Sequence, residues 1–138
     1  KMHLVVAIPT FNRCNYLKKN IYYFDQQNRP KNVKISLAVS NSASTDDTET
    51  FLRDLNNSRR DVSVFNKLTE WSGGNYGYLC QALPMDADWV WFMGDDDYLT
   101  DPSSLQKICE ILIKKNDDPN FKFVHACHGA FLSTIQKS

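Results

Sequence analysis

A strand-length apolar run near the N-terminus constrains the fold of this chain more than any other feature. Residues 4–8 read LVVAI, with no polar residue at either alternate position, and Pro9 closes the run. A strand with one face in water alternates apolar and polar residues, whereas a strand covered on both faces is continuously apolar. Residues 89–93 (WVWFM) repeat the pattern. These runs predict a sheet that is covered on both faces.

Segments with helical periodicity alternate with further strand-like runs. Besides the two apolar runs, strands are predicted at residues 33–39, 62–65 and 121–126. Helices are predicted at residues 13–27, 46–55, 75–83 and 101–113. Strands that alternate with helices are joined by right-handed crossovers. The predicted fold class is therefore α/β, with a Rossmann-like, mainly parallel sheet and helices on both faces.

Size and charge exclude several classes of protein. The chain has 138 residues, 42% of them hydrophobic, which suffices for one core, so residues 1–138 are predicted to form a single domain. Its 16 Lys and Arg residues balance 16 Asp and Glu residues, so no nucleic-acid partner and no polybasic membrane patch are expected. The apolar runs fall far short of the roughly 20 residues of a membrane helix, so no integral membrane segment is expected.

The cysteines indicate a reducing compartment. They are widely separated and form no C-x-x-C pair: Cys14, Cys80, Cys109 and Cys127. The N-terminus shows no secretory signal pattern, so free thiols and a cytoplasmic location are expected. His125, Cys127 and His128 stand close enough to suggest metal ligation, but strand alternation explains the cluster as well, because no second ligand pair is visible.

Polar clusters follow each of the first four predicted strands. They are residues 10–13 (TFNR), 41–47 (NSASTDD), 70–75 (EWSGGN) and 94–97 (GDDD). Because parallel strands all end at one edge of the sheet, these clusters are expected to meet there, where ligands of such folds bind. Helix N-termini at the same edge present unpaired amides that favour an anion. A ligand the size of a nucleotide would touch several clusters at once.

The acidic triplet at residues 95–97 is the sharpest single signal. Two carboxylates ~5 Å apart repel by about 3 kcal/mol at an effective dielectric constant near 20, so three of them favour a cation among them. Hard divalent ions take oxygen ligands and often combine one or two carboxylates with substrate phosphates. The alternative reading is a solvated acidic turn before a helix. The buried strand in front of the triplet favours the metal site.

The other clusters have structural alternatives. Thr10 and Asn12 either cap the first helix or contact a ligand. Residues 44–46 are more typical of a helix cap than of a ligand site. The glycines at 73–74 mark a tight turn but match no glycine-rich phosphate-binding motif. Trp71 either stacks on a base or covers the core.

Taken in order, these segments resemble the donor-binding half of a family 2 glycosyltransferase with the GT-A fold. Residues 5–13 (VVAIPTFNR) resemble the opening motif of the family, and residues 38–48 (AVSNSASTDDT) resemble the second. Residues 73–75 (GGN) are similar to the loop that opens its third helix, and residues 91–97 (WFMGDDD) to its acidic DxD-type motif. The resemblance covers roughly residues 4 to 100.

The resemblance implies a set of site residues. Asn41 stands where the base-reading Asp of the family usually lies, and an uncharged amide does not transfer a uracil preference. Gly94 replaces a frequent first Asp of the acidic motif, so the register of the ligands is open by one residue; in an extended chain Asp95 and Asp97 would share a side. The implied nucleotide-sugar-binding residues are Pro9, Thr10, Phe11, Asn12, Arg13, Asn41, Ser42, Gly74, Asn75 and Asp95, with Asp96 and Asp97 as ligands of Mn²⁺ or Mg²⁺.

The implied chemistry is an inverting transfer. An acceptor hydroxyl on a glycan, lipid-linked or protein acceptor attacks the anomeric carbon of a nucleotide-diphosphate sugar and expels the nucleoside diphosphate. The metal and Arg13 would stabilise the charge of the leaving group. The second half of such proteins supplies the acceptor site and the general base, so this chain is expected to lack most of that half, and no residue is assigned as the base.

Three other functions are compatible with a parallel sheet and an acidic segment in a chain of this length. A non-catalytic module of the same fold would bind the nucleotide without turnover. Phosphoacceptor signalling domains and haloacid-dehalogenase-type phosphatases need acids directly after the first strand, where this chain has residues 9–13 (PTFNR). The glycosyltransferase is therefore the leading prediction, with the binding module as its alternative.

Overall fold

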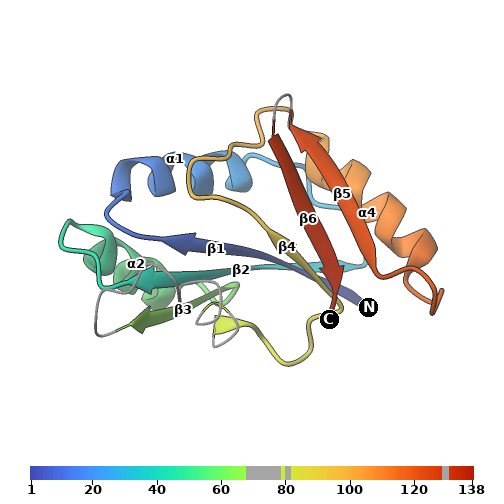
Figure 1. The fold of residues 1–138 in the computed structure, drawn as a ribbon, viewed down its shortest axis with the longest axis horizontal. Coiled ribbons are helices and arrows are strands. Elements are labelled where there is room, and N and C mark those ends of the chain that lie inside the picture. The colour runs from blue at the N-terminus through green and yellow to red at the C-terminus, as the bar shows by residue number, and fades with distance from the viewer. Residues whose placement is uncertain (68–78, 80–81, 129–130) are drawn as a thin grey trace.

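The computed structural model describes residues 1–67, 79, 82–128 and 131–138. Within them the chain forms a sheet with helices packed against it (Figure 1). The elements are β1 (Met2–Thr10), α1 (Cys14–Asp25), β2 (Val33–Ser42), α2 (Thr48–Ser58), β3 (Val62–Lys67), β4 (Trp89–Phe92), α4 (Ser104–Lys115), β5 (Phe123–His128) and β6 (Phe131–Lys137). Among the described residues the sheet has six strands in the order β3-β2-β1-β4-β6-β5.

The centre of the sheet is parallel, as the alternation of strands and helices predicts. β1 pairs in parallel with β2 and β4, and β2 with β3. The sequence did not predict β6, which runs antiparallel between β4 and β5. His128 of β5 pairs directly with Phe131 of β6, so no helix separates the two strands. The alternation of strands and helices that the sequence predicts therefore ends at β5. The α/β class is confirmed, with an antiparallel strand added at one side.

Side-chain alternation on β1 confirms that this strand is covered on both faces. Leu4, Val6 and Ile8 are fully buried in one cluster with side chains of α1, α2 and α4. Val5 and Ala7 are also fully buried, on the opposite face. A buried aliphatic side chain contributes about 1.5–3 kcal/mol. The central strand therefore anchors both layers and fixes where its own end lies.

Helix boundaries differ slightly from the prediction. α1 ends at Asp25, and α2 begins at Thr48 because the Asp46 carboxylate accepts the Thr48 N–H from outside the helix. α4 begins at Ser104, where Asp101 instead receives hydrogen bonds from Ser103. The helix predicted at residues 75–83 lies mostly outside the described residues. In the described part of the chain, no helix is long and apolar enough to cross a membrane.

Strand register sets the geometry of the sheet edge. Ala7 pairs with Phe92, and Thr10 pairs with Asn41. β1 thus continues three residues beyond its last pair with β4, which brings the chain after β4 alongside the end of β1. Met93 extends this approach by donating its N–H to the Ala7 carbonyl at 3.0 Å. The carboxyl ends of β1, β2 and β4 therefore meet.

Candidate functional site

A buried hydrogen bond joins the ends of β1 and β4. Thr10 is 2% exposed and Asp95 is 6% exposed. The Thr10 hydroxyl donates to Asp95 Oδ2 at 2.9 Å. Because Thr10 pairs with Asn41 in the sheet, the acidic segment also lies near the end of β2. The structure thus brings together three of the four clusters that the sequence places at this edge.

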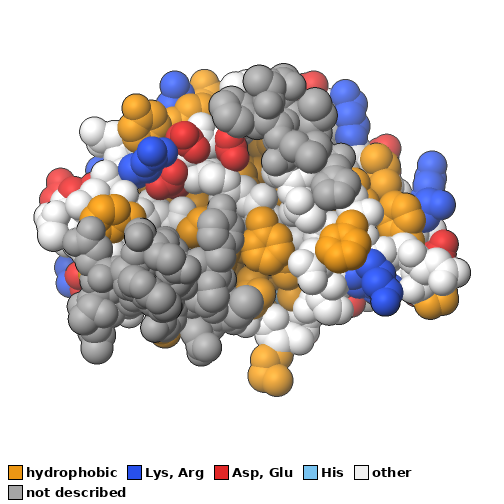
Figure 2. Space-filling view, viewed as in Figure 1, with side chains coloured by type: hydrophobic (Ala, Val, Ile, Leu, Met, Phe, Trp, Pro, Cys, Tyr) orange, Lys and Arg blue, Asp and Glu red, His pale blue; other side chains and the backbone are white. Residues whose placement is uncertain are grey.

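Arg13 lies between two carboxylates of the acidic segment. Its Nη1 is 3.4 Å from Asp95 Oδ1 and 3.2 Å from Asp96 Oδ2. Both contacts hold the pKa of the guanidinium above its usual value. Asp96 and Arg13 are about half exposed, and in Figure 2 acidic side chains gather around a basic one over the start of α1 and the loop after β4. Within the protein, the Arg13 guanidinium supplies positive charge beside these two carboxylates.

The pKa of Asp95 is raised above its usual value. Burial is the largest cause, the Thr10 hydroxyl and the Arg13 charge oppose it, and Asp96 adds repulsion. Ionised Asp95 is therefore held at a cost in free energy, and additional positive charge at this position would lower that cost. Perturbation by burial and specific charge partners is common where carboxylates meet ligands.

Asp97 faces back into the turn rather than toward Arg13. Its Oδ2 accepts the Gly94 N–H at 3.0 Å, and its own N–H donates to the Gly94 carbonyl at 3.2 Å. A Cβ on residue 94 would lie 3.0 Å from carboxylate oxygens of both Asp96 and Asp97, which accounts for glycine there. Because residues 94–97 form a turn, the alternation of an extended chain does not apply. Asp95 and Asp96, not Asp95 and Asp97, face the same guanidinium.

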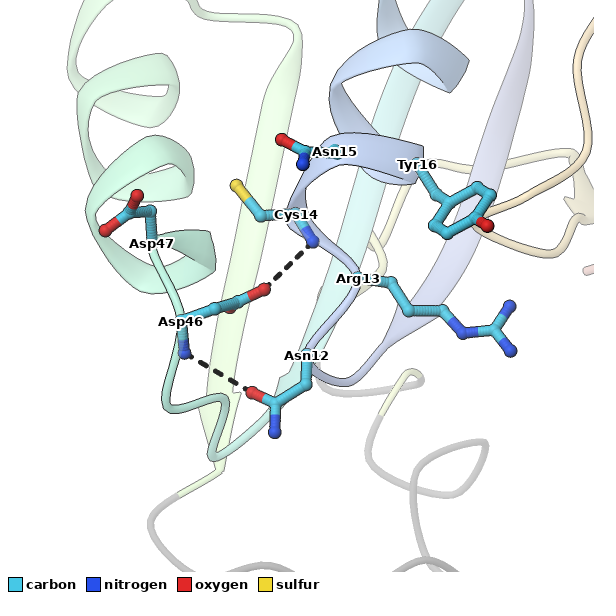
Figure 3. A pocket seen from close by; sticks show the side chains of 7 residues that line it. All are labelled: Asn12, Arg13, Cys14, Asn15, Tyr16, Asp46 and Asp47. Carbon is cyan, nitrogen blue, oxygen red and sulfur yellow. Dashed lines mark hydrogen bonds between the residues drawn. The ribbon is translucent and has the colours of Figure 1, made fainter.

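Asn12 and Asp46 bind each other's loops, and we call this pair the loop clasp. Asn12 Oδ1 accepts the N–H groups of Thr45 at 2.6 Å and Asp46 at 3.4 Å. In return, Asp46 Oδ2 accepts the Cys14 N–H at 3.0 Å (Figure 3). Asp46 Oδ1 also accepts the Thr48 N–H, so one carboxylate serves the first turns of α1 and α2. The Asn12 side chain is therefore engaged within the fold.

The pKa of Asp46 lies below its usual value. Burial by itself would raise it, but hydrogen bonds from Thr48 and from the Cys14 N–H outweigh burial. The sequence predicts a helix cap at residues 44–46, but the N-cap of α2 is Asp47, which makes no side-chain capping bond. The Asp46 carboxylate binds the Thr48 N–H from one position earlier. Ser44 instead joins the loops, because its hydroxyl accepts the Asn12 N–H at 3.0 Å.

The end of β2 places Asn41 and Ser42 inside the fold. They are 1% and 3% exposed. Asn41 donates through Nδ2 to Asn66 Oδ1 at 3.0 Å, and its Oδ1 accepts from the Ser44 hydroxyl. Both ends of the Asn41 amide, which the family resemblance predicts at the base-reading position, are thus engaged within the protein.

The remaining predicted residues divide into two groups. Pro9 and Phe11 are half-buried beside Thr10. Trp71, Gly74 and Asn75 lie outside the described residues.

Next to Arg13 is a pocket of about 220 Å³ between the first turns of α1 and α2 (Figure 3). Its lining residues are Asn12, Arg13, Cys14, Asn15, Tyr16, Asp46 and Asp47.

The described residues contain no group of three or more His, Cys, Asp or Glu side chains that could hold a metal ion. His125, Cys127 and His128 lie on β5, but their side chains fall outside the description. The carboxylates of Asp95 and Asp96 remain as a two-residue donor set. Two carboxylates suffice for a divalent ion when substrate phosphates complete its coordination.

Sequence reasoning missed two buried amides, one on α1 and one just after it. Asn20 is 2% exposed and Gln27 is 4% exposed, and both donate to carbonyl groups in the segment after β4. The available signal was position, because Asn20 lies on the helix face of Leu17, Ile21 and Phe24, which is buried. A polar residue on a buried face needs hydrogen-bond partners, and a loop supplies them.

Comparison with known proteins points to one family. A model of the family described as glycosyl transferase family 2 matches residues 5–128. The chain is 28% identical over 102 residues to the abequosyltransferase RfbV of Salmonella typhimurium. That match covers 74% of this chain but 30% of the relative.

Solved structures show the same fold. A mannosyltransferase from Pyrobaculum calidifontis, PcManGT, in complex with GDP-Man and Mn²⁺, superposes with a TM-score of 0.75 at 16% identity, over 98% of this chain and 44% of that protein. TarS 1-349 of S. aureus in complex with UDP gives a TM-score of 0.65 at 25% identity, over 82% of this chain and 32% of that one. The chain therefore has the GT-A fold and spans less than half of these relatives.

Proposed function

This chain belongs to glycosyl transferase family 2, and we propose that it is the donor-binding part of an inverting glycosyltransferase. It binds a nucleotide-diphosphate sugar at the carboxyl edge of its sheet. One arrangement carries the proposal. The buried carboxylate of Asp95 and the half-exposed carboxylate of Asp96 both contact the Arg13 guanidinium, and the Thr10 hydroxyl donates to Asp95. Among the structural neighbours, PcManGT is in complex with the donor GDP-Man and TarS 1-349 is in complex with the nucleotide UDP.

The donor lies along the loop after β1. Arg13 is half exposed and directly precedes α1, so its side chain can contact a diphosphate while its backbone stays in place. The positive end of α1 supports the same negative charge. Asp95 is also the proposed contact of the ribose or sugar, and Pro9, Phe11, Asn41, Ser42, Gly74 and Asn75 are the proposed contacts on the nucleotide side.

The donor set fits Mn²⁺ or Mg²⁺. Asp96 presents a half-exposed carboxylate, and Asp95 presents a buried one whose ionised form gains from added positive charge. Asp97 is held by the Gly94 N–H, which makes Asp95 and Asp96 the proposed pair. When bound, the divalent ion acts as a Lewis acid on the diphosphate oxygens.

In the transfer itself, the acceptor oxygen forms a bond to the anomeric carbon as the bond from that carbon to the diphosphate oxygen breaks. The hydroxyl proton passes to a general base. Arg13 holds the departing diphosphate, and Thr10 orients Asp95. No residue of this chain is assigned as the base, and we propose that the acceptor site and the base lie in parts of such proteins that this chain does not cover.

Calorimetric titration of UDP and GDP, each with and without Mn²⁺, tests the proposal. We expect Mn²⁺ to raise the affinity for one nucleotide by about tenfold or more, which is ~1.4 kcal/mol. The gain is lost in Asp96→Ala and weakened in Asp95→Ala, while Asp54→Ala, at an exposed site on α2, keeps it. Equal affinity with and without Mn²⁺ would contradict the metal site, and no binding of either nucleotide would contradict the proposed function.

The partial coverage of the relatives also favours a second candidate, a module that holds the nucleotide sugar without turnover. Hydrolysis of the donor sugar distinguishes the two. A transferase site releases nucleoside diphosphate with Mn²⁺ present, either in this chain or in a longer chain that spans the full length of the relatives. Binding without release in both cases supports the module.

A further inference from the structure

A buried amide of α1 holds both ends of the acidic turn. Asn20 Nδ2 donates to the Gly94 carbonyl at 3.2 Å and to the Asp97 carbonyl, and lies 3.5 Å from the Met93 sulfur. A carboxamide nitrogen carries two hydrogens, so the two carbonyls use both of them. Asn20 is 2% exposed, so water does not replace these bonds readily. The first and last residues of the turn are thus bonded to one helical side chain.

This arrangement decides which way the acidic side chains point. The carbonyls of Gly94 and Asp97 face α1, and the Asp97 carboxylate closes the turn on the Gly94 N–H. The two residues between them, Asp95 and Asp96, therefore present their carboxylates away from the helix interior, toward Arg13.

We propose that Asn20 is a positioning residue for the metal-binding pair, a role that rests on the proposed function. It acts through the backbone of residues 94–97 and touches neither metal nor nucleotide. Removing its donors takes one hydrogen bond from each of two carbonyls, of which the Gly94 carbonyl keeps the Asp97 N–H. The turn then relaxes to satisfy the lost bonds elsewhere. The distance between the two carboxylates then changes, and a divalent ion loses one of its ligands.

Gln27 supplies a matched control. It lies two residues beyond the end of α1, is 4% exposed, and donates through Nε2 to the carbonyls of Leu99 and Asp101, both at 2.8 Å. Its Oε1 accepts the Leu105 N–H at 2.9 Å. Gln27 therefore fixes the same connecting segment beyond the carboxylates. Loss of its bonds should affect folding without affecting the metal pair.

The experiment compares Asn20→Leu with Gln27→Met in the whole chain. Thermal unfolding measures stability, and calorimetry measures the affinity for GDP and UDP with and without Mn²⁺. We expect both variants to lower the unfolding temperature. Only Asn20→Leu is expected to reduce the Mn²⁺-dependent gain in nucleotide affinity, by about tenfold, with the metal-free affinity changed less than about threefold.

A second variant covers the case in which Asn20→Leu does not fold. Asn20→Ser keeps one hydroxyl donor in a smaller side chain, and we expect it to fold with an intermediate loss of the Mn²⁺ effect. A full Mn²⁺ effect in every folded Asn20 variant would overturn the inference alone. A wild-type chain that binds nucleotide without any Mn²⁺ effect would overturn the metal site of the proposed function, and the inference with it.

Discussion

The acidic turn and the loop clasp lie at the same edge of the sheet but use their carboxylates differently. In the clasp, the acceptors of Asn12 and Asp46 are filled by backbone N–H groups of neighbouring loops. In the turn, Asp95 and Asp96 face a hydroxyl and the half-exposed guanidinium of Arg13. Backbone partners are fixed by the fold, whereas one long side chain can exchange for a ligand. The comparison separates residues that stabilise the loops at the sheet edge from residues that are available to bind a ligand there.

The pKa directions agree with this division. The pKa of Asp46 is lowered, so its ionised form stabilises the folded state. The pKa of Asp95 is raised, mainly by burial, so its ionised form opposes folding at neutral pH. A carboxylate held against stability is a feature of functional sites more than of structural ones. Four predictions test this contrast, beginning with the largest expected effect.

The double variant Asp95→Asn/Asp96→Asn should separate binding from stability. We expect Mn²⁺-dependent nucleotide affinity to fall by about 100-fold, which is ~2.7 kcal/mol, because both charged ligands are lost. The free energy of unfolding should stay level or rise, because a buried charge and its repulsion from a neighbour are removed. Calorimetry and urea unfolding give the two quantities. A lower free energy of unfolding in the variant would mean that Asp95 and Asp96 stabilise the fold, as the residues of the loop clasp do.

Asp46→Ala should have the opposite signature. The variant removes the acceptor for the first amides of α1 and α2, and we expect the free energy of unfolding to fall by about 1–2 kcal/mol. Nucleotide affinity should change by less than about threefold, because Asp46 serves backbone groups. Asp47→Ala is the matched control, since this exposed neighbour makes no side-chain capping bond. Loss of Mn²⁺-dependent binding in Asp46→Ala would contradict the purely structural role assigned to the loop clasp.

Ala43→Gly should stabilise the loop that leads into the clasp. Ala43 has a φ of 52°, in the left-handed region that disfavours a Cβ. Relief of this strain exceeds the extra entropy of glycine in the unfolded chain, so a gain of about 0.5–1 kcal/mol is expected from denaturant unfolding. Asn12→Gly, at a φ of 50°, provides the contrast. It should lose stability, because the Asn12 oxygen that accepts the Thr45 N–H disappears.

The smallest effect is the pH dependence of Asp46. Its pKa is below the unfolded value of about 3.9, so its contribution is present above pH ~4 and is lost as pH falls through the lowered folded pKa. Unfolding temperatures of the wild type and Asp46→Asn should therefore differ at neutral pH and converge in acid. A difference that persists unchanged at low pH would mean that the charge of Asp46 contributes nothing to the clasp.

Much of the sheet edge could be predicted from the sequence, because it depends on patterns within short segments of the chain. Continuous apolar runs predict strands covered on both faces, and parallel strands end together, so Thr10 and Asp95 were expected at one edge. The structure supplies the contact between them. The antiparallel strand β6 was missed because it follows β5 without a helix between them. Asn20 was missed because a helix pattern marks a face as buried but not what a polar side chain on that face will bind.

By itself, the sequence determined the α/β class, the family resemblance and the gathering of Thr10, Arg13 and the acidic residues at one place. Periodicity and the direction of parallel strands are properties of a single chain read in order. Only the tertiary structure decided that Asp95 and Asp96 share a guanidinium, that Asp97 closes the turn, and that Asn12 and Asp46 join two loops. These outcomes depend on which hydrogen-bond partners lie within about 3 Å, and groups far apart along the chain reach that distance only after packing.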